Sequence, residues 1–229
     1  MKKKKVWYSE LAYAAGILIL ALGTAFMERA DFGMSMVVAP AYLLHLKISK
    51  VVTAYTFGMS EYVFQAVLIA ALSIIMRRFK KSYLFSFLTA VIYGFTLDLA
   101  IMAAAPLPMN GLVWRGVFFL AGMFLCATGV SFLFHTYLSP EADELFVKEI
   151  AVRAGRDINK VKTVYDCCSC FAGIILSFAF FGFGHFEGVK AGTILCALVN
   201  GWLIGRISRF LEKQFDFQDR LPYRRFFEG

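Results

Sequence analysis

Two acidic residues fall in the middle of long apolar stretches. Glu61 lies ten residues after Val51 and Asp98 lies fifteen residues after Tyr83, or about 15 Å and about 22 Å along ideal helices. A charge inside hydrocarbon costs at least about 2.5 kcal/mol, and such residues often bind a polar substrate or carry protons. Gln65, one turn after Glu61, would share its face. No basic residue is adjacent to Glu61 on its helix, so a binding role and a structural role both stay open for it.

Asp31, near the end of the first apolar stretch, completes this set of substrate-binding or proton-coupling candidates. The alternative interpretation is that intramembrane charges form ion pairs that hold helices together. This structural interpretation is favoured for three further residues: Arg115, Asp166 and Arg206. The expected pairs are Asp98 with Arg115 and Asp166 with Arg206.

Cys167, Cys168 and Cys170 form the densest group of soft metal ligands in the sequence. Cys167 and Cys170 would share a helical face, but no histidine is near and a second ligand pair is missing. Apolar cysteines at a helix contact explain the pattern better. The histidines are scattered, at His45, His135 and His185. Nucleophile motifs and phosphate loops are also missing, so we expect no metal, no cofactor and no enzymatic activity.

The composition is that of a polytopic membrane protein. Of 229 residues, 59% are hydrophobic, and the mean hydropathy is +0.66, whereas a soluble domain is about 45–50% apolar. The net charge of +8 does not indicate nucleic-acid binding, because the basic residues lie between apolar runs. Six segments are long enough to cross about 30 Å of hydrocarbon, and they span residues 11–30, 51–76, 83–105, 111–137, 164–183 and 189–210.

The basic residues predict how the chain is oriented. If the N-terminus is inside, most of them lie in the cytoplasm, in residues 2–5, 77–81, 148–162 and the tail with Arg224 and Arg225. Few remain outside, and this asymmetry is the positive-inside pattern. We therefore expect a multi-pass protein of the cytoplasmic membrane with both termini cytoplasmic.

A short stretch occurs twice, as KVVTAY at residues 50–55 and KVKTVY at residues 160–165. Each half then holds three spans, and an odd number inverts the second half in the membrane. The predicted fold is an all-α polytopic membrane protein of six transmembrane helices, arranged as two inverted three-helix repeats at residues 1–108 and 109–229. The connections at residues 32–50 and 138–162 each form a short interfacial or re-entrant segment.

Within the second connection, Ser139 is the expected N-cap of a short helix at the cytoplasmic interface, with Pro140 and Glu141 in its first turn. Small residues predict where long helices approach closely. Those of the first and fourth spans are Gly16, Gly23 and Gly129, and those of the third and sixth are Ala90, Gly94, Ala197, Gly201 and Gly205.

Short motifs along the chain resemble the YitT/YczE-type family of small bacterial integral membrane proteins, including its DUF6198 branch. The motifs are ADFGMS at residues 30–35, Gly94 to Asp98, Ser139-Pro140-Glu141, Lys160-Val161-Lys162 with Tyr165-Asp166, and Gly192-Thr193 with Gly201. In the first motif Met36 stands where the family usually has proline. The resemblance implies a six-helix, transporter-like protein and brings no substrate with it.

These observations favour a secondary transporter of a small polar metabolite, a vitamin-like compound or an ion. One alternative is the substrate-binding membrane subunit of an ATP-driven transporter, with Ala21 and Ala25 as a docking stripe. A non-transporting scaffold is the other. The expected partners are the lipid bilayer and an unidentified small molecule, with a second copy or transporter subunits as further alternatives. The substrate, the coupling ion and the direction of transport do not follow from the sequence.

Overall fold

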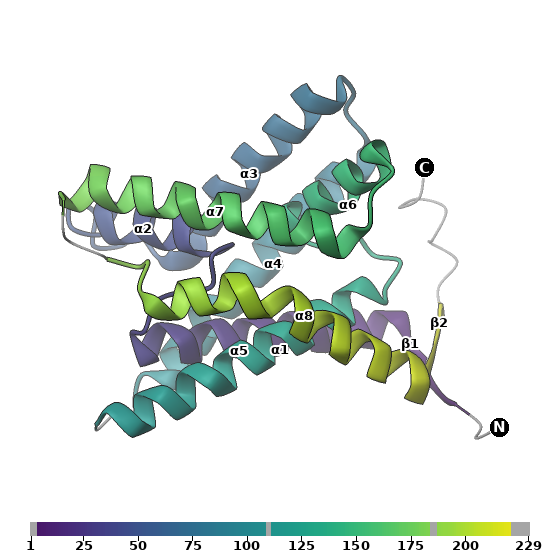
Figure 1. Ribbon diagram of the computed structural model, residues 1–229, viewed down its shortest axis with the longest axis horizontal. Coiled ribbons are helices and arrows are strands. Elements are labelled where there is room, and N and C mark those ends of the chain that lie inside the picture. The colour runs from purple at the N-terminus through teal and green to yellow at the C-terminus, as the bar shows by residue number, and fades with distance from the viewer. Residues whose placement is uncertain (1–3, 109–110, 184–186, 221–229) are drawn as a thin grey trace.

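A computed structural model describes residues 4–108, 111–183 and 187–220. His185, Arg224 and Arg225 lie outside the described residues. The described helices are α1 (Ser9–Ala30), α2 (Ala39–Ile48), α3 (Phe57–Met76), α4 (Lys81–Ala104), α5 (Leu112–Phe134), α6 (Ala142–Ala154), α7 (Ile158–Phe181) and α8 (Ala191–Gln214). The short strands β1 (Lys5–Tyr8) and β2 (Phe215–Gln218) pair in parallel beside the two termini (Figure 1).

Six of these helices are long and apolar enough to cross a membrane, and they are α1, α3, α4, α5, α7 and α8. The predicted class, an all-α membrane protein with six spans, is therefore confirmed. Because the six spans alternate in direction, residues 9, 76, 81, 134, 158 and 214 lie at one end of the bundle. We call this end, which also holds β1 and β2, the terminal face. The other end is the opposite face.

Two predicted spans begin elsewhere than expected, and local capping explains both changes. The second span begins at Phe57 rather than at residue 51, because the Thr56 side chain accepts the Met59 N–H and caps α3. The fifth begins at Ile158 rather than at residue 164, and Asp157 accepts the Lys160 N–H there. The duplicated letters thus form turns at residues 50–55 but helix at residues 160–165.

The helices nevertheless follow the same order in both halves. Each half has a long helix, a short helix and two more long helices. The contacts between helices also correspond: α1 packs on α4 as α5 packs on α8, and α2 packs on α7 as α6 packs on α3. This exchange of short helices between the halves is consistent with a two-fold relation. The inverted superposition and the boundary at residue 108 stay predictions.

The first connection contains the ten-residue helix α2, which packs on α3 and α7. Its entry turn forms with Met36 in place of the proline that the family resemblance implied, because Ser35 O accepts the N–H groups of Val38 and Ala39 at 3.0 and 2.8 Å. Gly33, at φ 107°, makes the preceding bend in a conformation that favours glycine.

The central contact joins α1 and α5, and it is built on glycines seven residues apart on each helix. A Cβ on Gly23 would lie 2.7 Å from Cys126 N, and one on Gly129 would lie 2.7 Å from Gly16 O. The predicted close approach at Gly16, Gly23 and Gly129 is therefore confirmed. Gly205 differs from the prediction, because a Cβ there would meet nothing within 4 Å.

These distances predict opposite effects of one methyl group at two helical glycines. Gly23→Ala forces two backbones apart and should destabilise the protein by about 1–3 kcal/mol. Gly205→Ala enters open space and should be neutral or stabilising by up to about 1 kcal/mol, since alanine favours helix. Thermal unfolding in detergent checks the pair, and equal melting temperatures would contradict this account of the α1–α5 contact.

Candidate functional site

The most unusual feature of the interior is a cluster of buried acids around one lysine. Glu61 on α3, Glu141 before α6, Asp143 and Glu144 on α6 and Asp166 on α7 are each at most 6% exposed. Lys162 on α7, 4% exposed, is the cation among them. We call these six residues the acid cluster. Its formal charge is strongly negative, and buried charges of one sign are expensive unless they are paired or protonated.

Lys162 is the hub of this cluster. Its Nζ lies 2.7 Å from Glu144 Oε1, 3.3 Å from Asp166 Oδ1 and 3.9 Å from Asp143 Oδ2. The ammonium thus joins α7 to the first turn of α6. Asp143 and Glu61 also interact electrostatically with Glu141, and no ion pair joins either glutamate to a cation within the described residues.

A small cavity of about 30 Å³ adjoins the cluster. It is lined from both halves of the chain, by α1, the 35–38 turn, α4, α5, α6, α7 and α8. Its polar lining comprises Thr24, Ser35, Tyr93, Glu141, Asp143, Glu144, Lys162 and Asn200. This volume holds about two water molecules. We call it the central cavity.

The short helix α6 brings three of the acids to this place. Gln65 on α3 fixes the start of α6, because its Oε1 accepts the Ala142 N–H at 2.8 Å and its Nε2 donates to Glu141 Oε2 at 3.3 Å. Both hydrogen bonds are buried. Gln65, predicted to be a binding candidate, is placed by the structure as a positioning residue.

The prediction for α6 is wrong in its N-cap. The helix begins at Ala142, so Glu141 rather than Ser139 takes the N-cap position. Asp143 and Glu144 in its first turn are 3% exposed, whereas its last turn, with Val152, is exposed, and its place at the cytoplasmic interface stays a prediction. The burial of the first turn has a tertiary reason: Gln65 and Lys162 offer its polar groups partners inside the bundle.

Glu61 lies beside the central cavity but is not part of its lining. The prediction that Glu61 lines the binding site stays a prediction; the structure places Glu61 in the acid cluster, where it interacts electrostatically with the lining residue Glu141. Glu61 is 1% exposed and its Oε1 has no hydrogen-bond partner within the described residues. Glu61 and Asp166 each lie fifteen residues before the end of their helix, α3 and α7.

The remaining predicted candidates lie near the opposite face. Asp98 Oδ1 accepts the Gly58 N–H at 2.9 Å and so caps the N-terminus of α3. Asp31, with its side chain 60% exposed, pairs with Lys190 and with Arg115, whose Nη2 is 3.0 Å away. Arg115 is thus an ion-pair residue as predicted, but its partner is Asp31 instead of Asp98. These residues join helix ends rather than form part of the acid cluster.

The predicted pair of Asp166 with Arg206 is replaced by another arrangement. Asp166 is fully buried and pairs with Lys162 one turn away on the same helix, at 3.3 Å. Arg206 instead stacks over the Trp202 ring on α8, 5.7 Å from its centroid. The sequence did contain a signal for the pair of Lys162 with Asp166, because residues four apart lie on the same face of a helix.

The sequence prediction therefore missed most of the site, namely Glu141, Asp143, Glu144, Lys162, Tyr93 and Asn200. A usable signal existed in the three acids within residues 141–144, between two apolar spans. In the structure, burial first and then the nearby carboxylates of Asp143, Glu61 and Glu144 raise the pKa of Glu141 well above its usual range. Burial also raises the pKa of Glu144 to about 7, against the opposing effect of Lys162.

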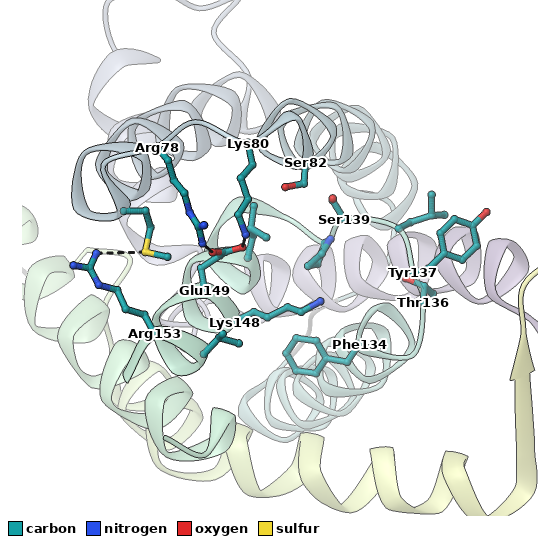
Figure 2. Close-up of a pocket in the computed structure, with 15 residues that line it drawn as sticks. Arg78, Lys80, Ser82, Phe134, Thr136, Tyr137, Ser139, Lys148, Glu149 and Arg153 are labelled. Carbon is teal, nitrogen blue, oxygen red and sulfur yellow. Dashed lines mark hydrogen bonds and ion pairs between the residues drawn. The ribbon is translucent and has the colours of Figure 1, made fainter. Parts of the chain in front are cut away.

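A larger hollow of about 690 Å³ opens at the terminal face. Figure 2 shows Arg78 and Lys80 converging on Glu149, and Lys148 extending its amine into the hollow. Its inner side is the turn at Ser139 and Pro140, which directly precedes Glu141. We call this hollow the vestibule. Its charge is opposite to that of the acid cluster, so the two sites are chemically distinct.

Hydroxyl groups of α4 hold the turn that separates the vestibule from the central cavity. Thr89 donates to Ser139 O at 2.8 Å, and Ser86 donates to Pro140 O at 2.6 Å. Tyr13 on α1 also bonds Thr89 at 2.8 Å. Side-chain hydrogen bonds from α4 therefore hold this turn in place between residues that line the vestibule and residues that line the cavity.

Comparison with known proteins identifies the class. The chain matches the family of unknown function DUF6198 over residues 7–209, and it belongs to that family. The match covers all six spans except the last five residues of α8. Neither the curated proteins nor the solved structures contain a match.

Removal of the one cation of the acid cluster should make stability depend more strongly on pH. The raised pKa of Glu144 means that the folded protein keeps a proton that the unfolded chain releases between about pH 4.5 and about pH 7. Stability therefore falls as pH rises through this window. Lys162→Met removes the opposing charge, so its melting temperature should drop more at pH 8 than at pH 5. Lys148→Met, exposed in the vestibule, is the control, and equal drops at both pH values would contradict the assignment.

Proposed function

We propose that this membrane protein is a secondary transporter whose substrate site is the central cavity with its acid cluster. The observation that carries the proposal is a buried, charged cavity lined by helices from both halves of the chain. Inverted-repeat transporters bind substrates at such an interface, near the middle of the membrane. Buried ionisable groups inside a bundle also mark substrate or proton pathways.

The arrangement of barriers supports alternating access. On the terminal side the Ser139–Pro140 turn separates the cavity from the vestibule. On the opposite side, the Met34 N–H donates to Gly188 O at 3.0 Å and joins the two halves beside Ser35. Rocking of one half against the other would break one set of contacts while keeping the other. We place the terminal face in the cytoplasm, because most basic residues lie at that end.

The alternative function, a substrate-binding subunit of an ATP-driven transporter, was based on an expected docking stripe on α1. Ala21 and Ala25, expected to offer a docking stripe, are 0% exposed and belong to the core. A non-transporting scaffold has no evident use for a buried acid cluster, which would weaken the fold without benefit. We likewise propose a non-enzymatic role, with a small polar molecule or ion as substrate.

Cys126 gives a direct test, because its thiol lines the central cavity and is 5% exposed. With the other four cysteines replaced by alanine or serine, a membrane-impermeant thiol reagent is applied to right-side-out and to inverted vesicles. A transporter predicts slow labelling of Cys126 from both sides. A variant with Cys196 as its single cysteine is the control, since Cys196 is 1% exposed and not in the lining. Labelling from neither side would indicate a scaffold, and labelling from one side only would indicate a receptor-like pocket.

A further inference from the structure

Several hydrogen-bond acceptors on residues that line the central cavity have no donor. Within the described residues, Glu141 Oε1, Asp143 Oδ1 and Glu144 Oε2 are buried without a hydrogen-bond partner. Asn200 Oδ1, from α8 across the cavity, is equally unpaired although Asn200 is 6% exposed. Buried polar atoms are paired in the great majority of cases, so this number in one place points to a missing partner.

Three nearby donors, on Lys162, Thr24 and Tyr93, are already used. Lys162 donates to Glu144 Oε1 at 2.7 Å, and the Thr24 hydroxyl donates to Leu20 O at 3.0 Å while bonding Tyr93 Oη at 2.9 Å. A water molecule could satisfy some acceptors, but it brings no charge to offset the surplus of carboxylates. The complementary ligand is therefore positive and carries its own N–H or O–H donors.

The geometry favours hydrogen bonding over metal coordination. No three His, Cys, Asp or Glu side chains of the described part of the chain are placed so as to hold one metal ion together. The unpaired oxygens belong instead to side chains from different elements, α6 and α8, around a cavity of about 30 Å³. An ammonium group distributes three N–H donors in this way and is close to water in size.

We propose that the central cavity binds a small protonated amine, which replaces protons held by the acid cluster. This inference deepens and rests on the proposed transport function, because it names the substrate class of the same site. The raised pKa values of Glu141 and Glu144 agree with protons that occupy the site when the amine is absent. Binding of RNH₃⁺ to a protonated carboxyl group releases one H⁺, so charge in the site is conserved.

The groups that face Glu141 and Glu144 make this exchange possible. Asp143 on the same helix, Glu61 on α3 and Asp166 on α7 oppose ionisation, whereas Lys162 favours it. Gln65 bonds one Glu141 oxygen, and the other oxygen faces no donor. Ionisation of one further carboxyl group is therefore costly until a cation arrives.

The probe for this test is methylammonium chloride, applied to the full-length protein purified in detergent. At saturating concentrations it should raise the melting temperature by at least about 2 °C, with apparent affinity rising up to about tenfold per pH unit from pH 5 to pH 7. Sodium and tetramethylammonium chlorides are the comparisons, because neither cation has N–H donors. A weakly buffered dye assay should detect about one proton released per methylammonium bound.

Two variants test whether methylammonium binding and proton release depend on the unpaired acceptors of the central cavity. Asn200→Ala keeps every charge and removes one acceptor, so it should weaken methylammonium binding about tenfold. Glu144→Gln should abolish most of the proton release. If Glu144→Gln does not fold, because its bond to Lys162 is lost, the Asn200 variant still decides the matter. Glu149→Gln, which lies in the vestibule, is the matched control and should bind as the unchanged protein does.

Each outcome separates this inference from the transport function. Equal stabilisation by sodium would overturn it in favour of an ion site, and no response to methylammonium, or an unchanged affinity in Asn200→Ala, would also overturn it. Cys126 labelling from both sides without amine binding would leave transport intact with another substrate. Amine binding without labelling from both sides would instead leave a cation-binding protein that does not transport.

Discussion

The close contact of α1 with α5 is the constraint on which the rest of the structure depends. Lipid gives apolar helices no hydrophobic reason to associate, so close backbone packing has to hold the two halves together. Gly23 and Gly122 meet at one level and Gly16 and Gly129 at another, and each Cβ that is missing there would lie 2.7–3.1 Å from the facing helix. Two spans pack directly on this pair, α4 against α1 and α8 against α5, and α3 and α7 pack in turn on α4 and α8.

The arrangement of helices around the α1–α5 contact also leaves room for a polar site inside an apolar bundle. The short helices α2 and α6 each pack between the two halves, α2 on α3 and α7, and α6 on α7 and α3. The contact of α6 with α7 places Asp143 and Glu144 beside Lys162, at 3.9 and 2.7 Å, and its contact with α3 brings Glu141 to Gln65. One ammonium cannot balance the charge of five carboxylates. The remaining carboxyl groups are therefore stable only when they are protonated or, in the proposed function, when a cationic ligand is bound.

The same segment connects binding with closure. The turn at Ser139 and Pro140 closes the cavity toward the vestibule, and the next residue, Glu141, is part of the acid cluster. A change in the charge or occupancy of Glu141 therefore acts directly on the backbone that Thr89 and Ser86 hold. In the proposed transport cycle, opening toward the vestibule would break these hydrogen bonds, and a ligand would drive it only by binding the open state more tightly than the closed one.

The sequence by itself determined the class, the six spans and the presence of close helix contacts at the glycines of α1 and α5, because hydrophobic length and small residues act locally along each helix. That these two helices contact each other was decided by the tertiary structure. The sequence also indicated that Glu61, Gln65 and Asp166 need polar partners, since an unpaired charged or polar side chain is costly within hydrocarbon. Only the tertiary structure decided what those partners are. The pair of Asp166 with Lys162 is local, one turn apart on α7, and the tertiary structure decided that Arg206 stacks on Trp202 and does not join it. The start of α6 is held by Gln65 and Lys162 through contacts 77 and 18 residues apart in the sequence. Spacing within one helix carries no information about contacts of that range.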